Sequence, residues 1–185
     1  MKHIFNGIDV TLINEPHYSI NSTDNVRSYE VELCRNNEYQ HSSAHGLFVG
    51  DTDCPESSVI FLGVGGATGV HQYSFTIKDD SCYVASGDSI FSLKLPSLEV
   101  NWIKKVDFAT CFGVFWVNEF DCLISWGELE ICRLDSCGNK IWTISGPEIF
   151  TEGFEFAGDH VLVTDFDGIV HKISIETGLS VQVGT

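Results

Sequence analysis

Three small groups of residues have the types and spacing found in some catalytic or ligand-binding sites. His41 and His45 are four residues apart, with Cys54 beyond them, and on a helix this spacing presents two ligands to zinc. Their segment, NNEYQHSSAHG, is polar, is typical of a loop and has no Cys-x-x-Cys partner. We therefore expect no metal site here. Hydrogen-bonded structural roles are also expected for His71, His160 and His171, which lie on or near predicted strands.

The stretch VIFLGVGGATGVH (59–71) has the strand and the glycines of a dinucleotide-binding turn. After Gly63 and Gly65 that fingerprint requires a glycine at position 68, where this chain has Thr68. The residues that follow read as a strand, so no helix N-terminus is available for a pyrophosphate. A structural turn is the better interpretation, and we expect no cofactor.

The third group is a pair of carboxylates, Asp165 and Asp167, on either side of Phe166. Paired carboxylates can perform acid–base catalysis. Aspartate is also favoured in tight turns because its side chain bonds to the local backbone, and no nucleophile with a histidine and an acid lies nearby. We predict no catalytic residue.

The overall charge restricts the possible partners. The chain has 26 acidic and 10 basic residues, a net charge of −16, which disfavours nucleic acid and anionic membranes and favours cationic proteins. No apolar run approaches the ~20 residues of a membrane span, and the first residues lack the apolar core of a signal peptide. Seven cysteines without a Cys-x-x-Cys pair indicate free thiols in a reducing cytoplasm.

The strands that would position any site follow a repeat of 38 to 40 residues. Residues 81–102, 121–142 and 159–181 each contain an apolar strand, a tight Gly/Asp turn, an alternating strand, a polar turn and a third strand. A further strand-like run precedes each unit: HQYSFTIK, CFGVFWVNE and GFEFAG. Four strands in about 40 residues are typical of one β-propeller blade.

The last unit, VLVTDFDGIVHKISIETG, resembles the repeats of quinoprotein- and WD-type β-propellers. In such repeats a D-G turn precedes V-x-x-x-D-x-x-T-G, and a tryptophan follows on the outer strand. Gly168, Thr177 and Gly178 match this pattern, and Trp102 and Trp142 have the outer-strand position in the other two units. The resemblance covers about residues 71–185 and implies blade-like sheets. The chain has too few blades for the central channel of the quinone-binding enzymes, so their cofactor is not expected.

We therefore predict a single all-β domain, a partial or minimal propeller-like stack of about four antiparallel sheets. Residues 1–70 are expected to form an irregular N-terminal sheet, with strands in VRSYEVELCR, GLFVG and SSVIFLGVG. Residues 71–107, 108–146 and 147–185 are expected to form the three blade-like repeats.

Acidic residues gather in the second half of the chain, where twelve lie between positions 106 and 171 against only Arg133 and Lys140. In a propeller, the turns between the second and third strands of a blade share one face with the connections between blades. Asp88 and Asp107 would lie on that face. Aromatic anchors among carboxylates suit a basic protein partner, and the predicted partner-binding residues are Trp126, Glu128, Glu130, Glu148, Phe150, Glu152, Asp165, Phe166 and Asp167.

The segments TCFGVFWVNEFDCLISWGELEICRL and SGPEIFTEGFE also resemble small acidic bacterial immunity proteins of contact-dependent inhibition and polymorphic toxin systems. This resemblance implies a cytoplasmic, non-enzymatic protein that binds and neutralises a basic, nuclease-type toxin. Two alternatives remain open. One is a small-ligand-binding protein or hydrolytic enzyme that uses the concave side, although the innermost strands are largely apolar and aromatic. The other is a protein-interaction scaffold.

Overall fold

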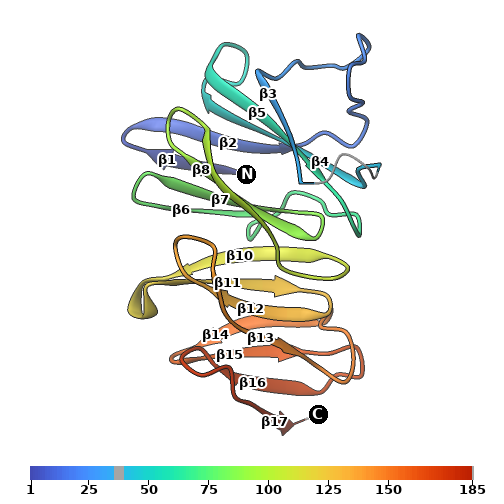
Figure 1. Cartoon of the computed structure of the whole chain (residues 1–185), viewed down its shortest axis with the longest axis vertical. Helices are drawn as coiled ribbons and strands as arrows, with labels where there is room; N and C mark the ends of the chain where they lie inside the picture. The colour runs from blue at the N-terminus through green and yellow to red at the C-terminus, as the bar shows by residue number, and fades with distance from the viewer. Residues whose placement is uncertain (36–39, 185) are drawn as a thin grey trace.

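The chain folds into four β-sheets that stack in the order of the sequence (Figure 1). The computed structural model describes residues 1–35 and 40–184. Regular structure in these residues is almost entirely strand, apart from one short 3-10 helix, Asn118–Phe120. The predicted all-β, propeller-like stack is confirmed.

Each of the three predicted repeats forms one antiparallel sheet, in which strands adjacent in sequence are adjacent in space. The second sheet contains β6 (Phe75–Lys78), β7 (Ser81–Ser86), β8 (Ser89–Lys94) and β9 (Glu99–Lys105). The third sheet contains β10 (Cys111–Val117), β11 (Cys122–Gly127), β12 (Glu130–Leu134) and β13 (Lys140–Ser145). The fourth sheet contains β14 (Gly153–Ala157), β15 (His160–Thr164), β16 (Val170–Ser174) and β17 (Ser180–Gly184).

The first sheet is irregular, with the strand order β1-β2-β4-β5-β3. Its strands are β1 (Lys2–Phe5), β2 (Ile8–Asn14), β3 (Val31–Cys34), β4 (Ser43–Gly50) and β5 (Pro55–Gly63). β3 runs parallel to β5, and the other pairs are antiparallel. The strand expected over VRSYEVELCR (26–35) is shorter than predicted, because β3 covers only Val31–Cys34. Part of the polar stretch NNEYQHSSAH, residues 36–39, lies outside the described residues, and its last three residues begin β4.

The hairpin of β1 and β2 was not expected from the sequence. Its turn is Asn6–Gly7, and both residues have positive φ, 49° and 83°. Asn-Gly is a strong signal for a tight hairpin turn, because these two residues adopt left-handed backbone angles at little cost. This dipeptide is the feature that would have identified the hairpin.

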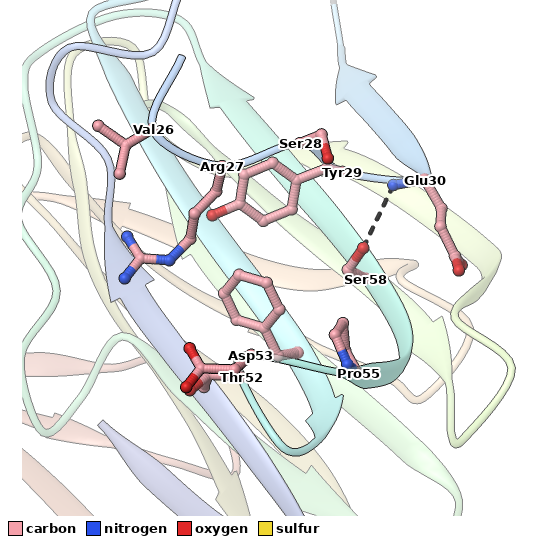
Figure 2. A pocket seen from close by; sticks show the side chains of 10 residues that line it. Val26, Arg27, Ser28, Tyr29, Glu30, Thr52, Asp53, Pro55 and Ser58 are labelled. Atoms are coloured by element: carbon pink, nitrogen blue, oxygen red, sulfur yellow. Dashed lines mark hydrogen bonds between the residues drawn. The ribbon is translucent and has the colours of Figure 1, made fainter.

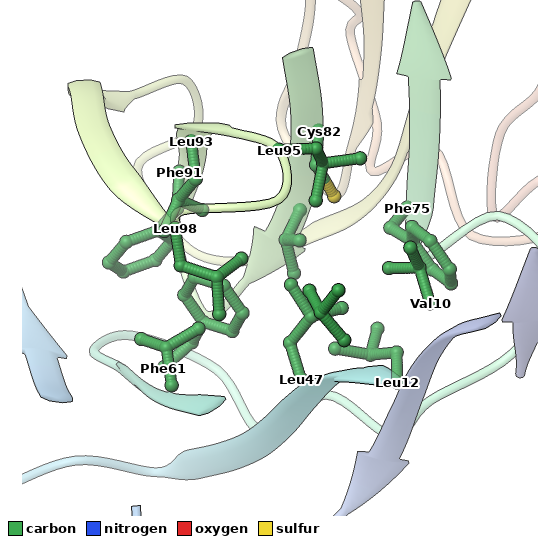
Figure 3. Close-up of a cluster of buried hydrophobic side chains, with 13 residues drawn as sticks. Val10, Leu12, Leu47, Phe61, Phe75, Cys82, Phe91, Leu93, Leu95 and Leu98 are labelled. Atoms are coloured by element: carbon green, nitrogen blue, oxygen red, sulfur yellow. The ribbon is translucent and has the colours of Figure 1, made fainter. Parts of the chain in front are cut away.

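Hydrophobic side chains fill the space between neighbouring sheets, and the alternation of each strand sends successive residues to opposite interfaces. In β11, Leu123 packs toward the second sheet and Ile124 toward the fourth. Figure 3 shows the core between the first two sheets, where Leu12 and Leu47 meet Phe75 from the second sheet. This burial, at roughly 25 cal/mol per Å² of apolar surface, is the main force that holds the stack together.

Two tryptophans on outer strands tie successive blades together. The Trp102 Nε1–H donates to the carbonyl of Ser136 at 2.9 Å, and the Trp142 Nε1–H donates to the carbonyl of Ile175 at 3.0 Å. A Cβ atom added to Gly178 would lie 2.9 Å from Trp142, and one added to Gly138 would lie 2.7 Å from Trp102. The Trp and Gly positions of the repeat pattern therefore form one contact between neighbouring sheets.

The series of tryptophan contacts ends at the fourth sheet. Trp142 pairs with Arg133 across β12 and β13, and the corresponding pair across β16 and β17 is Lys172 with Val181. Val181 thus has the position of the tryptophan, but its side chain is 58% exposed. In Figure 1 the first and fourth sheets lie at opposite ends of the stack, so these two sheets do not meet.

Candidate protein-interaction face

The turns of the blades and the connections between sheets meet on one side of the stack. The amide of Cys111 donates to the carbonyl of Gly87 at 2.6 Å, and that of Glu128 to Thr110 at 2.7 Å. At the last interface, the amide of Phe166 donates to Ile149 at 2.8 Å. We call this surface the turn face; it comprises residues 64–74, 86–89, 106–110, 127–130, 146–152 and 164–169.

Several carboxylates of the turn face are buried and hold the backbone. Asp107 is fully buried, and its two oxygens accept four backbone N–H groups at 2.6 to 3.0 Å. The donors are the amides of Ala109, Thr110, Leu129 and Glu130, so Asp107 joins a connection between sheets to the β11–β12 turn. Asp88 is also buried. It accepts from Arg35 at 2.7 Å and lies 3.5 Å from the Lys105 ammonium.

Asp165 is likewise a structural residue and is not available to a partner. It is fully buried, and its Oδ1 accepts the amides of Asp167 and Ile169 at 3.1 and 2.9 Å. Its Oδ2 lies 2.7 Å from the Nε2 of His171. The hydrogen bond to His171 is the main cause that lowers the pKa of Asp165. The expectation that Asp165 is a surface residue is corrected, because turn geometry accounts for its position.

Two further residues of the predicted site are buried. Phe150 is 1% exposed and packs between the third and fourth sheets, with its ring centroid 5.5 Å from that of His171. Glu130 opens β12, where burial raises its pKa and the Lys140 ammonium lies 3.8 Å away. Phe150 is buried because its ring packs in the hydrophobic core between the two sheets. Glu130 is buried because its backbone amide is held by Asp107. Neither side chain offers a free surface to a partner.

The remaining acidic residues do lie at the surface. Glu148, Glu152 and Asp167 are exposed, and Glu128 is half-buried and accepts a hydrogen bond from the Thr110 hydroxyl at 2.7 Å. Phe166 is 64% exposed beside Asp167 in the β15–β16 turn. These residues keep the combination of aromatic and acidic groups that the sequence predicted, on a smaller set of positions.

Sequence reasoning missed a second exposed aromatic residue, Phe108. Its side chain is 72% exposed in the connection between β9 and β10, and the Lys105 ammonium lies 5.0 Å from its ring centroid. An aromatic residue within a polar connection is the same signal that pointed to Phe150. The two differ because Phe150 reaches the core between sheets, while Phe108 points outward.

Trp126 lines a hollow at the inner rim of the turn face. This aromatic hollow has a volume of about 560 Å³ and is lined by His71, Gln72, Tyr73, Phe112, Trp126 and Thr151. The Trp126 Nε1–H donates to the carbonyl of Phe150 at 3.0 Å, which fixes the half-buried ring. The aromatic surface continues onto β14 and β10, where Trp126 stacks on Phe154 and Phe154 stacks on Phe115.

A second hollow, of about 630 Å³, lies on the first sheet beneath the loop of residues 26–30 (Figure 2). Hydrogen bonds hold the loop against the sheet and against Glu15. The Glu30 amide donates to the Ser58 hydroxyl at 3.2 Å, and the Tyr29 hydroxyl donates to Glu15 at 2.9 Å. The Tyr29 ring packs 5.2 Å from that of Phe48. This arrangement is what packing of the loop onto the sheet requires.

The other chemical groups of the sequence have structural roles. The His41 ring lies 3.0 Å from the carbonyl of Tyr18, and the His45 ring lies 3.1 Å from that of Thr68. The described residues contain no group of three or more His, Cys, Asp and Glu side chains placed to hold a metal ion. Burial raises the pKa of four strand thiols, which makes them poor nucleophiles; they are Cys82, Cys111, Cys122 and Cys132.

The glycine-rich stretch after β5 leads to β6 through a connection of turns and bends, with no helix. A Cβ atom on Gly63 would meet the backbone of Gly87 at 2.5 Å, so this glycine allows two turns to approach closely. Within the described part of the chain, no helix is long and apolar enough to span a membrane.

Comparison with known proteins supports the fold. No family model and no curated protein sequence matches this chain. Among solved structures, BamB from Moraxella catarrhalis is similar with a TM-score of 0.55 and 16% identity, over 75% of this chain and 42% of that one. The Pan2 WD40 domain of Neurospora crassa is similar with a TM-score of 0.51 and 14% identity, over 61% of this chain and 38% of that one. The N-terminal domain of Nup159 is similar with a TM-score of 0.50 and 12% identity, over 61% of this chain and 34% of that one.

These identities are low, so the likeness is one of fold alone. The chain spans well under half the length of these three structures. The predicted resemblance to propeller repeats is confirmed, and the chain has the sheet arrangement of part of a β-propeller.

Proposed function

We propose that this chain is a non-enzymatic protein-interaction domain whose turn face binds a cationic protein. The observation that supports this proposal most directly is the surface on which Phe108 and Phe166 are exposed together with Glu148, Glu152 and Asp167. Exposed aromatic rings can be buried by a partner and supply binding energy. Carboxylates around them, in a chain of net charge −16, would steer a basic partner to the same surface.

In its more specific form, the proposal is that the partner is a basic, nuclease-type toxin and that this cytoplasmic protein is its bacterial immunity protein. This form rests on the resemblance inferred from the sequence of residues 110–134 and 145–155, for which the comparisons with known proteins give no match. Charge supports it as well, because an acidic inhibitor can compete with nucleic acid for a basic catalytic groove.

A scaffold that binds a basic partner without inhibiting it is the second candidate. The propeller-like fold favours it, since sheets of this kind present turns and connections as a binding surface. The two candidates differ in one measurable consequence, which is whether the partner's activity stops on binding.

The test starts from the gene directly upstream of this protein's gene, where the immunity form predicts a toxin domain; the encoded domain is purified and immobilised. Binding rates are measured between about 0.05 and 0.5 M salt, and nuclease activity is measured with and without the protein. The proposal predicts saturable binding whose association slows as salt shortens the screening length. Loss of nuclease activity would support the immunity form, and binding with full activity would support the scaffold. Absence of binding to this domain and to a panel of other basic domains would refute both.

A further inference from the structure

The aromatic hollow is walled by three rings that stand at steep angles to one another. The Trp126 ring lies at 61° to that of Phe112, with centroids 5.3 Å apart, and at 67° to that of Tyr73, with centroids 6.3 Å apart. The face of an aromatic ring carries partial negative charge, and the indole face of tryptophan attracts cations best. A group held in this hollow would therefore contact surfaces that favour positive charge.

The polar groups of the hollow add no positive charge. The six lining residues include no Lys or Arg. The Nδ1 of His71 accepts the amide of Tyr73 at 3.2 Å, so this nitrogen carries no proton, and burial lowers the pKa of His71. The ring is therefore neutral at neutral pH.

A carboxylate lies next to one of the residues that line the hollow. The hydroxyl of the lining residue Thr151 donates to the Oε1 of the exposed Glu152 at 3.1 Å. An anionic ligand would meet this carboxylate and no cation among the lining residues. A ligand with a positive head and an apolar stem would gain from both the rings and the carboxylate.

We propose that the aromatic hollow binds one arginine side chain of the cationic partner, with the guanidinium on the face of Trp126 opposite the one stacked on Phe154, and within reach of Glu152. Arginine is favoured over lysine because its planar, weakly hydrated group stacks on aromatic rings and can still donate to a carboxylate. The hollow opens at the inner rim of the turn face, so a chain bound to Phe108 and Phe166 has an arginine site beside it. This inference deepens the proposed function and rests on it.

The test uses two short peptides that differ only in charge, acetyl-Gly-Arg-Gly-amide and its citrulline counterpart. Citrulline keeps the length and the planar head of arginine but is neutral. Titration is followed by NMR through the indole N–H signal of Trp126, assigned with the Trp126→Phe variant. We expect a saturable shift with the arginine peptide, and binding of the citrulline peptide at least about fivefold weaker.

Variants of the lining residues show whether arginine binding depends on the aromatic rings or only on the apolar shape of the hollow. Phe112→Leu and Tyr73→Leu keep an apolar wall but remove a ring face, and each should reduce the preference for arginine over citrulline. Glu152→Gln should weaken arginine binding and leave citrulline binding unchanged. The control is Phe120→Leu, which changes an aromatic residue of the 3-10 helix that does not line this hollow, and it should change neither. Thermal unfolding of each variant checks that the fold is retained.

The outcomes for the hollow and for the turn face are distinct. Equal binding of the two peptides, or no shift of the Trp126 signal up to the solubility limit, would overturn the arginine site even if the upstream toxin domain still binds the protein. Specific arginine binding without binding of any basic protein would support the hollow and refute the proposed function.

Discussion

At the scale of single residues, a strongly acidic sequence does not imply an equally acidic surface. Asp88, Asp107 and Asp165 are buried, and each accepts hydrogen bonds that hold a turn or a connection in place. A buried carboxylate persists only when such donors surround it. The acidic character of the turn face therefore depends mainly on Glu148, Glu152 and Asp167.

The charge of Asp165 should matter for stability, and its effect should depend on pH. Because His171 and two backbone amides lower the pKa of Asp165 in the folded protein, its stabilising effect is present above the usual pKa of Asp, about 3.9. The effect is lost as the pH falls through the lowered value. We expect Asp165→Asn to lower the urea midpoint clearly at pH 7 and by less at pH 3.

The matched control is Asp167→Asn, in the same turn, whose side chain is exposed. It should leave the urea midpoint nearly unchanged at both pH values. An equal loss of stability for Asp165→Asn at pH 7 and pH 3 would contradict the charged role of Asp165.

At the scale of elements, the contact between an outer-strand tryptophan and the glycine of the next blade holds successive sheets together. Gly178 and Gly168 both belong to the fourth sheet and both have positive φ, 74° and 79°. They differ in surroundings, because a Cβ atom on Gly178 would lie 2.9 Å from Trp142, while one on Gly168 would meet nothing within 4 Å. This pair separates backbone strain from the tryptophan contact.

We expect Gly168→Ala to destabilise the protein by about 1 kcal/mol, the cost of a left-handed backbone with a Cβ atom. Gly178→Ala should cost about 1–3 kcal/mol more, because the ring of Trp142 must move. Denaturant unfolding followed by tryptophan fluorescence measures both. Equal destabilisation by the two variants would show that the contact does not contribute.

The repeat allowed the three blade-like sheets and their tryptophan and glycine positions to be predicted, because alternation and spacing are local features. The β1–β2 hairpin was missed although Asn6–Gly7 signals it. The burial of Phe150 and Asp165 could not be predicted, since it depends on how a connection packs against the next sheet. Of the candidate site, the face itself and the exposure of Phe166 and Asp167 were predictable; the placement of Trp126 in a hollow with Tyr73 required the folded chain.

At the scale of the whole molecule, the two ends of the stack differ. Tyr18 and Tyr29 cover the outward side of the first sheet by packing against Ile60 and Leu62. On the fourth sheet, Val181 has the position that Trp142 has on the third, and it remains largely exposed. The fourth sheet therefore lacks the tryptophan that ties the preceding sheets together.

Substitutions at these two corresponding positions should differ strongly in effect. Trp142→Val gives the third sheet the residue that the fourth sheet has, and we expect a loss of about 2–4 kcal/mol because a ring packed between sheets is removed. Val181→Ala should change the free energy of unfolding by less than about 0.5 kcal/mol. Comparable losses in the two variants would mean that the fourth sheet's outer face is covered.

Charge and aromatic residues of the turn face should affect different steps of binding. Replacing Glu148 and Glu152 by Gln should slow association with the basic partner and flatten its salt dependence. Replacing Phe108 or Phe166 by Ala should instead speed dissociation, by a factor of about 30 if the residue contributes about 2 kcal/mol. Stopped-flow or surface-based kinetics measures both rates. Unchanged rates after all four substitutions would place the binding surface elsewhere.

The binding role of the turn face is tested most directly by a hydrogen-exchange footprint of the protein in complex with the basic domain that binds it. The turn-face proposal predicts slower amide exchange in residues 106–110, 146–152 and 164–169, which carry Phe108, Glu152 and Phe166. It predicts no change in the loop of residues 26–30 or in β17. Protection confined to that loop or to the outer face of the fourth sheet, with the turn face unchanged, would contradict the account.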